Sequence, residues 1–264
     1  MTKSKKTEKN EKEIIVEKIE EEIIKSPEEN IFEMEQKEEI IEEKPLLKES
    51  NEINLENWVP KTKLGRLVKD KKINLEEIFA KKEKILEPEI VDNLIKTETD
   101  LIMIGQSKGK FGGGKARAWR QTQKKTAEGN VPRFTAMVVV GNKEGYVGLG
   151  WGKAKETLPA RDKAIRKAKL NLIKVTRGCG SFDCTCNENH SIPFKTEAKV
   201  GSSKIILIPA PKGTGLVVDD ECKKILYLAG IKDVYSKTFG QTRTKINLAK
   251  ACIKALEKLN EVKK

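Results

Sequence analysis

Alternating positions in the middle of the chain predict two strands joined by a turn. Residues 133–140 place two sets of side chains on opposite faces, which is the period of a strand. The sets are Phe134, Ala136, Val138 and Val140 on one face, and Thr135, Met137 and Val139 on the other. Residues 141–145 (GNKEG) have the composition of a hairpin turn. Residues 146–151 are therefore predicted to be the returning strand.

The returning strand and the segment after it carry two further patterns. Gly148, Gly150 and Gly152 alternate along the strand, which would let one face lie flat against either a phosphate backbone or a packed helix. Thr157 is the predicted N-cap of the next helix, with Pro159 in its first turn. The predicted core-facing stripe is Leu158, Ile165, Ala168 and Leu172, and the outer face is Arg161, Lys163, Arg166, Lys167 and Lys169.

Helices are also predicted in front of the hairpin, across residues 51–95. Asn54, Thr62 and Asn74 precede helix-forming runs as N-cap residues, and Pro60 and Pro88 separate the pieces. The apolar stripe of the third run is predicted to be Ile78, Phe79, Lys82, Ile85 and Leu86. Residues 100–105 (DLIMIG) predict a short strand between these helices and the hairpin.

The C-terminal part predicts a second unit of strands and helices. Strands are expected at 192–200, 204–209 and 231–236. One helix is expected from Asp219 or Asp220 to Ala229, where Gly230 stops it, and a last helix at 246–259. The fold class is therefore α+β, and 264 residues are enough for two ordinary domains.

Charge divides the chain into an acidic tail and a basic remainder. Residues 1–50 hold 16 acidic and 10 basic residues, whereas the rest holds 24 acidic and 43 basic ones. The tail is interpreted either as disordered, because it buries too little apolar surface to fold alone, or as an amphipathic helix that docks on a basic neighbour. Residues 106–177 alone hold 18 basic and 4 acidic residues, a density best explained by a polyanionic partner.

The densest charge lies in a predicted glycine-rich loop, residues 108–130. Gly112, Gly113 and Gly114 leave its backbone without a preferred conformation until a partner fixes it. Trp119 is either a buried staple for the loop or a stacking platform for a base. The charged helix face that follows is either solvated or part of the same interface. The expected RNA contacts are Lys108, Lys110, Lys115, Arg117, Arg120, Lys124, Lys125, Arg133, Lys153, Lys155 and Arg166.

Cysteine and histidine form a second candidate site. Cys179, Cys184, Cys186 and His190 have the spacing Cys-x4-Cys-x-Cys-x3-His, a complete set of four zinc ligands. The single residue between Cys184 and Cys186 is a tight gap, so two interpretations remain open. The first is a structural zinc site. The second is three packed thiols, with His190 bonded to a neighbouring backbone group.

The other cysteines and the apolar runs bound the environment of the protein. Cys222 and Cys252 lie on the apolar sides of predicted helices and are expected in the core. Five cysteines without a signal peptide are typical of a reducing compartment. No apolar run approaches the roughly 20 residues that span a bilayer, so we expect no membrane partner.

An enzyme is the competing class of function. Residues 209–218 (PAPKGTGLVV) form a proline- and glycine-rich loop before a helix, where backbone amides can cradle a phosphate. The loop lacks the Lys-Ser/Thr ending of a phosphate-binding loop, and Asp219, Asp220 and Glu221 would repel the anion. We therefore expect no catalytic residue. A stand-alone RNA-binding regulator is a third class that the domain content permits.

Several runs resemble the family of the small-subunit ribosomal protein numbered five. They are RFTAMVVVGNKEGYVGLGWGKAKE (133–156), ARDKAIRKAKLNLIKV (160–175), SIPFKTEAKVGSSKIILIPAPKGTGLVV (191–218) and YLAGIKDVYSKTFGQTRTKIN (227–247). The resemblance spans roughly residues 101–259. The stretch RGCGSFDCTCNENHSIPF (177–194) is similar to the archaeal branch of the family.

The resemblance implies an N-terminal domain similar to double-stranded-RNA-binding folds and a β-α-β-β-α C-terminal domain. The corresponding boundaries are a tail at 1–50, a helical region at 51–95, an RNA-binding domain at 96–177, a Cys/His linker at 178–191 and a C-terminal domain at 192–264. The basic loop is longer and richer in glycine than the usual family loop, and the tail has no counterpart in the family pattern.

The same resemblance implies a cytoplasmic, non-enzymatic component of the small ribosomal subunit. Such a protein binds ribosomal RNA and neighbours the small-subunit proteins numbered four and eight. It lies near the side where messenger RNA enters, and it supports the accuracy of decoding.

The acidic tail generates a first testable prediction. A chain that starts at Asn51 should keep the melting temperature of the full-length protein, because residues 1–50 are acidic and poor in core-forming aromatic residues. Thermal unfolding followed by circular dichroism measures both proteins. A loss of several degrees on truncation would show that the tail packs on the folded part.

Overall fold

The computed structural model describes residues 58–106, 116–186 and 188–261. The tail prediction for residues 1–50 and the predicted flexibility of Gly112, Gly113 and Gly114 lie outside the described residues. The chain divides into the units Met1–Trp58 and Val59–Lys264, and the architecture below is that of the second unit.

The predicted hairpin is the centre of a five-stranded sheet. Strands β3 (Gly129–Gly141) and β4 (Tyr146–Ala154) pair antiparallel, and β1 (Glu98–Leu101), β2 (Arg120–Thr126) and β5 (Leu172–Lys174) complete the sheet. β1 pairs with the C-terminal half of β3 and β2 with its N-terminal half. One long strand therefore carries two neighbours in succession along the same edge, and it begins before the predicted residues 133–140.

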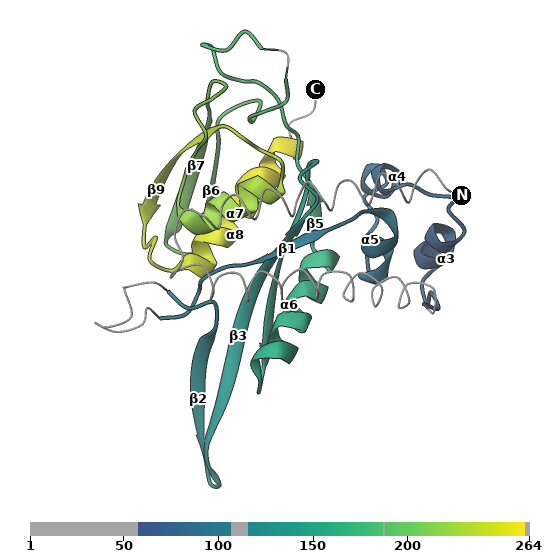
Figure 1. The fold of residues 1–264 in the computed structure, drawn as a ribbon, viewed down its shortest axis with the longest axis vertical. Helices are drawn as coiled ribbons and strands as arrows, with labels where there is room; N and C mark the ends of the chain where they lie inside the picture. Colours follow the sequence, from purple (N-terminus) through teal and green to yellow (C-terminus); the bar gives the residue numbers. More distant parts are fainter. Residues whose placement is uncertain (1–57, 107–115, 187, 262–264) are drawn as a thin grey trace, which may run out of the picture. The chain divides into compact units, whose positions relative to one another are not determined.

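Residues 120–126 correct the prediction of a loop that runs to residue 130. They form β2, whose register joins Arg120 to Thr135 and Thr126 to Gly129. β2 and the first half of β3 form a largely exposed hairpin that extends past the rest of the sheet (Figure 1). The sequence RQTQKKT has no apolar alternation, so its strand conformation depends on pairing with β3. The strand predicted at 100–105 is also shifted, because pairing with β3 begins at Glu98.

Helix α6 (Thr157–Leu170) packs on β3 and β4 through very small side chains (Figure 1). Its buried residues are Ala160, Ala164 and Ala168, and they face the three alternating glycines of β4. A Cβ atom at Gly150 would lie 1.9 Å from the carbonyl oxygen of Ala164. Cβ atoms at Gly148 and Gly152 would lie 2.2 and 2.1 Å from the carbonyl oxygens of Ala168 and Ala160. The glycines of the strand therefore accommodate a packed helix and not a phosphate backbone.

This close approach also explains why the predicted stripe of α6 is mostly wrong. Leu158 is 67% exposed, Ile165 is half-buried, and Leu172 belongs to β5; only Ala168 is fully buried. A large apolar side chain has no room between two backbones at this distance. The helix also begins differently, since Glu156 and not Thr157 occupies the N-cap. On the predicted outer face, Lys169 is half-buried and forms an ion pair with Asp92 at 2.7 Å.

Three short helices precede the sheet: α3 (Lys63–Lys69), α4 (Leu75–Ala80) and α5 (Glu89–Leu94). The predicted cap of α3 is confirmed, because Thr62 Oγ1 accepts the Gly65 N–H at 3.0 Å. Helix α4 is shorter than predicted, since Lys82 takes a positive φ of 54° that ends the helical path. The side chain of Asn74 makes no cap bond there. In the predicted stripe, Ile78 and Ile85 are buried and Leu86 is exposed.

The C-terminal part forms a second, four-stranded sheet in the order β6-β7-β9-β8. Its strands are β6 (Thr196–Val200), β7 (Ser203–Pro209), β8 (Leu216–Val217) and β9 (Val234–Gly240), and only the β8–β9 pair is parallel. Helices α7 (Asp220–Leu228) and α8 (Lys245–Glu261) cover one face (Figure 1). None of the described helices combines the length and the apolar composition needed to cross a membrane.

The predicted α+β class is confirmed, but the element order of the C-terminal part is not the β-α-β-β-α that the resemblance implied. The observed order is β-β-β-α-β-α. The difference arises at Gly201, whose φ of 60° turns β6 directly into β7 before any helix is reached.

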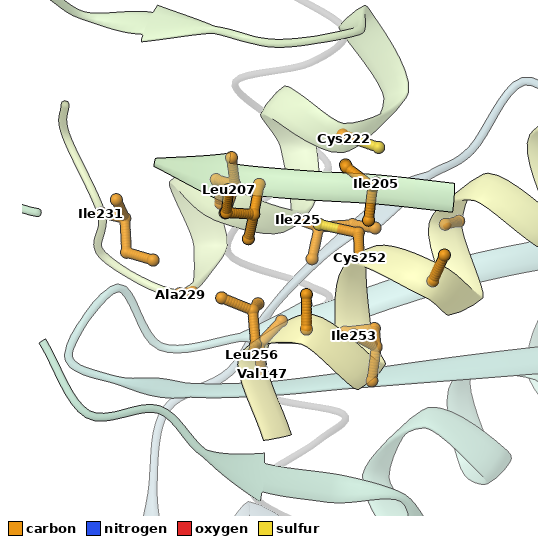
Figure 2. Close-up of a cluster of buried hydrophobic side chains, with 14 of the residues drawn as sticks. Val147, Ile205, Leu207, Cys222, Ile225, Ala229, Ile231, Cys252, Ile253 and Leu256 are labelled. Atoms are coloured by element: carbon orange, nitrogen blue, oxygen red, sulfur yellow. The ribbon is translucent and has the colours of Figure 1, made fainter. Parts of the chain in front are cut away.

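One hydrophobic core joins the two sheets. It contains Met137, Val139 and Val147 of the first sheet together with Ile225 of α7 and Leu256 of α8. Figure 2 shows part of this cluster, with Val147 among the side chains of the second sheet and its helices. Because α6 covers the opposite face of β3, the C-terminal half of this strand is buried on both sides. Cys222 and Cys252 are fully buried in the same core, as predicted.

The contact between β4 and α6 generates a second prediction. Gly150→Ala should lower the free energy of unfolding by about 3 kcal/mol, because the new methyl group must separate two packed backbones. The matched control is Gly178→Ala, whose Cβ would meet the Pro193 Cβ at 3.3 Å and should cost less than about 1 kcal/mol. Urea unfolding of both variants provides the comparison. Equal losses would contradict a backbone-to-backbone interface.

Candidate nucleic-acid interface and cysteine cluster

Eight of the eleven predicted RNA-contacting residues lie in the described part of the chain, and all eight are exposed. They are Arg117, Arg120, Lys124, Lys125, Arg133, Lys153, Lys155 and Arg166. Lys108, Lys110 and Lys115 lie outside the described residues. Within the described ranges, none of the eight forms an ion pair with a carboxylate. Their charge is thus available to an anionic partner.

Strand register places four of these cations on one face of the sheet. Arg120 pairs with Thr135, which pairs with Lys153, and Arg133 pairs with Thr122. Directly paired residues and those two apart along a strand point to the same side. The four residues Arg120, Lys124, Arg133 and Lys153 therefore share the face opposite α6, and we call them the strand cations. Lys125 points to the other face, by the same alternation.

The strand cations continue a face that is buried further along β3. Met137 and Val139 lie on this face in the shared core, two and four residues after Thr135. One side of β3 is therefore buried where α7 and α8 cover it, and it is a basic surface in the part that these helices do not cover. Lys155, in the turn before α6, and Arg166, on the exposed side of that helix, are not members of this group. Arg161, Lys163, Arg166 and Lys167 of the charged helix face are exposed, and their contact with RNA stays a prediction.

Backbone contacts join the two segments that flank the glycines at 112–114. The Gly105 N–H donates to the Arg117 carbonyl at 2.8 Å, and a Cβ atom at Gly105 would lie 2.2 Å from the carbonyl oxygen of Trp119. The Trp119 side chain is half-buried against the cluster of Ala136 and Val138. Of the two interpretations of Trp119, this packing favours the staple.

Arg177 and Glu221 are positioning residues that the sequence reasoning missed. The Arg177 guanidinium donates to the carbonyl oxygens of Glu144 at 2.9 Å and of Lys143 and Gly230 at 3.5 Å, and so joins the β3–β4 turn to the end of α7. Glu221 is 8% exposed, and its carboxylate accepts the Met103 N–H at 2.8 Å. No local sequence motif marks either residue, because both bind backbone groups that are far away in sequence.

The structure brings the four predicted metal ligands together. The side-chain ligand atoms of Cys179, Cys184, Cys186 and His190 all lie within 4.8 Å of one another. Cys184 Sγ is 3.0 Å from Cys186 Sγ and 3.6 Å from His190 Nε2, and Cys186 Sγ is 3.7 Å from Cys179 Sγ. A β-bridge between Gly178 and Ser191 closes the base of this segment. The arrangement offers three sulfur atoms and one imidazole nitrogen to a single centre.

The thiols of the cluster differ in acidity. Hydrogen bonds from the Cys186 side chain and from the backbone N–H groups of Cys186 and Lys212 lower the pKa of Cys184 to about 6. At Cys179, partial burial followed by hydrogen bonding with Cys184 raises the pKa to about 11. Cys184, the thiol that faces His190, is therefore more acidic than Cys179.

His190 is oriented by a buried carboxylate. Its Nδ1 lies 2.8 Å from Asp233 Oδ2, and the two residues are 3% and 4% exposed. The expectation that the imidazole bonds to a backbone group is therefore wrong. Instead, the backbone carbonyl of His190 accepts the N–H groups of Lys232 and Asp233. The ring leaves Nε2 directed at the thiols.

The same carboxylate occupies the loop that an enzyme would use for phosphate. Asp233 Oδ1 accepts the N–H groups of Gly213 at 3.1 Å and Gly215 at 2.8 Å. These amides belong to the PAPKGTGLVV loop, and a phosphate cradle needs them free. The loop is thus a structural turn around Asp233, and these two amides are not free to bind a phosphate.

Comparison with known proteins gives one consistent result. Residues 118–176 match the family domain described as "Ribosomal protein S5, N-terminal domain", and residues 198–264 match "Ribosomal protein S5, C-terminal domain". The small ribosomal subunit protein uS5 of Nanoarchaeum equitans is 53% identical over 213 residues, covering 80% of this chain and 91% of that protein. The uS5 proteins of Aeropyrum pernix and Methanocaldococcus jannaschii are 49% and 47% identical, covering 79% and 78% of this chain and 90% and 89% of theirs.

Proposed function

The chain belongs to the S5 family of small-subunit ribosomal proteins, and on that premise we propose that it is a structural component of the cytoplasmic small ribosomal subunit that binds ribosomal RNA. The family is structural and not enzymatic. A stand-alone RNA-binding regulator becomes an alternative outcome of the experiments below.

The strand cations are the observation that supports RNA binding most directly. Four exposed cations, Arg120, Lys124, Arg133 and Lys153, share one face of an extended hairpin and have no carboxylate partner among the described residues. Lysine and arginine at such positions contact phosphate oxygens and release condensed counterions. Since double-stranded RNA is recognised mainly through its shape and backbone, this surface needs no aromatic platform. The packed position of Trp119 agrees with that.

Protein neighbours fit a different surface, the open face of the second sheet. Val217, Tyr235 and Phe239 are 51%, 40% and 51% exposed. Val217 is paired with Tyr235, and Phe239 lies four residues further along β9 on the same side. Aromatic and aliphatic side chains gathered on one exposed face are typical of protein interfaces. We propose that the proteins numbered four and eight lie beside this protein, and that this face is one of the contacts.

Two finer parts of the proposal depend on family membership alone. A position near the side where messenger RNA enters, and a role in the accuracy of decoding, follow from the resemblance. In this proposal the exposed β2–β3 hairpin is the part that contacts RNA.

Removal of the strand cations gives the third prediction. Replacement of Arg120, Lys124, Arg133 and Lys153 by Gln should weaken binding to ribosomal RNA evenly across RNA sequences. It should also reduce the slope of log affinity against log salt by about 3, since each lost phosphate contact removes about 0.7–0.9. Filter binding over a salt series measures both quantities.

The matched control replaces four exposed lysines of the helical region by Gln: Lys61, Lys63, Lys81 and Lys84. The net charge changes equally, so a general effect of charge would reduce the slope equally. If the two variants lose the same slope, or if the first loses none, the strand cations are not the RNA contact.

The fourth prediction concerns the subunit and the apolar face. The protein should remain with small subunits after a high-salt wash, and a photo-crosslinking residue at Phe239 should attach it to a ribosomal protein. The same residue at Leu86, which is 66% exposed in another part of the unit, serves as the control. Loss of the protein in the wash would favour the stand-alone regulator, and attachment to RNA at Phe239 would refute the protein contact.

A further inference from the structure

The segment between Gly178 and Ser191 has almost no apolar interior. Phe182, its one large apolar residue, is fully exposed, and the three cysteines are only half-buried. Among the described residues of this segment His190 alone is buried. A closed loop of this length loses much conformational freedom on folding, and burial of apolar side chains does not offset that loss here. Another interaction must hold the loop.

The distances in the cysteine cluster suit one tetrahedral zinc ion. With Zn–S bonds of about 2.3 Å and a Zn–N bond of about 2.0–2.1 Å, tetrahedral angles require sulfur atoms about 3.8 Å apart and sulfur-to-nitrogen distances of about 3.6 Å. The Cys179–Cys186 distance is 3.7 Å and the Cys184–His190 distance is 3.6 Å. The Cys184–Cys186 distance of 3.0 Å is the short one, and it would widen by less than about 1 Å on binding.

The groups around the four ligands are those that a zinc site needs. Asp233 accepts the Nδ1–H of His190, which fixes the tautomer that leaves the Nε2 lone pair free for a metal. Backbone N–H groups of Cys186 and Lys212 point at the Cys184 sulfur and stabilise a thiolate. Three thiolates and one imidazole are soft donors that select zinc over magnesium or calcium. Packed thiols alone would not require a buried carboxylate behind the histidine.

The surroundings also connect the cluster to a second loop. Asp233 holds His190 through one oxygen and the amides of Gly213 and Gly215 through the other. Lys212 directly precedes Gly213 in this second loop. Its backbone N–H donates to Cys184, and its side chain forms an ion pair with Glu188 at 2.7 Å. A metal at the cluster would therefore order two loops at once.

We propose that Cys179, Cys184, Cys186 and His190 bind one zinc ion, and that this ion holds the 178–191 loop and, through Asp233, the 211–215 loop in their folded conformations. The site is structural, since all four positions around the metal are filled by the chain and no place is left for water or substrate. It is independent of RNA binding by the strand cations.

Metal content of the purified full-length protein tests the site directly. Prepared without chelator, wild type should contain one zinc per chain, and Cys184→Ala/Cys186→Ala should contain none. The matched control is Cys222→Ala/Cys252→Ala, which also removes two thiols but from the core, and it should keep its zinc. Addition of cobalt to metal-free wild type should give the visible absorption of a tetrahedral thiolate complex. Because this experiment uses wild type only, it tests the site even if a variant fails to fold.

Three results would overturn the proposal. They are wild type without zinc and without a tetrahedral cobalt spectrum, equal zinc in wild type and the Cys184/Cys186 variant, or loss of zinc only from the core variant. Asp233→Asn separates an orienting role from mere packing, because it should weaken zinc binding by about 10- to 100-fold in a competition with a chromophoric chelator. Unchanged affinity would remove Asp233 from the site.

Hydrogen exchange tests the link between the two loops. Removal of zinc from wild type should speed amide exchange in peptides that cover 178–191 and in those that cover 211–217, while peptides of β4 and α6 keep their protection. Faster exchange in the first loop alone would refute the coupling through Asp233. No change in either loop would refute the structural role of the metal.

Discussion

The contact between the backbones of β4 and α6 is the constraint on which the first half of the molecule depends. Gly148, Gly150 and Gly152 let Ala160, Ala164 and Ala168 approach until no Cβ atom fits between them. The helix must then occupy this face of β3 and β4 completely. As a consequence, the opposite face is the one that receives the C-terminal helices near Met137 and Val139 and that carries the strand cations beyond them.

The second half of the molecule depends in a similar way on Asp233. It is nearly inaccessible to solvent, and both of its oxygens are used, one by His190 and the other by the amides of Gly213 and Gly215. A buried carboxylate requires such partners, because an unpaired one would lose its hydration without compensation. The loop that looked suited to phosphate is therefore organised around a negative charge of the chain itself. This is the physical reason why a ribosomal protein can carry such a loop without catalytic activity.

The unit presents two kinds of surface to its surroundings. The extended β2–β3 hairpin is basic and exposed, which suits a phosphate backbone whose contacts depend on charge. The open face of the second sheet presents Val217, Tyr235 and Phe239, which suit a protein neighbour. Since the shared core joins the two sheets, the two surfaces are held on one body. A component of a ribonucleoprotein particle needs such a body, because RNA and protein contacts must be made together.

Much of this could be predicted from the chain alone. Alternation over 133–140 predicted β3, and the turn residues 141–145 predicted the hairpin. The stop at Gly230 predicted the end of α7, and apolar spacing predicted α8, because each of these signals is local. The family was also visible in runs of residues. The Cys/His spacing identified the ligand set, since four ligand residues within twelve positions can converge in one closed loop.

Other features were decided only by tertiary structure. The sequence RQTQKKT becomes a strand because β3 offers it a free edge, and α6 buries alanines instead of Leu158 because glycines on another element come within contact distance. The pairing of Asp233 with His190 joins residues 43 positions apart. No local period encodes such a pair. Hydrophobic pattern and turn chemistry act over a few residues, whereas pairing edges, close backbone contacts and buried carboxylates exist only once distant segments have packed.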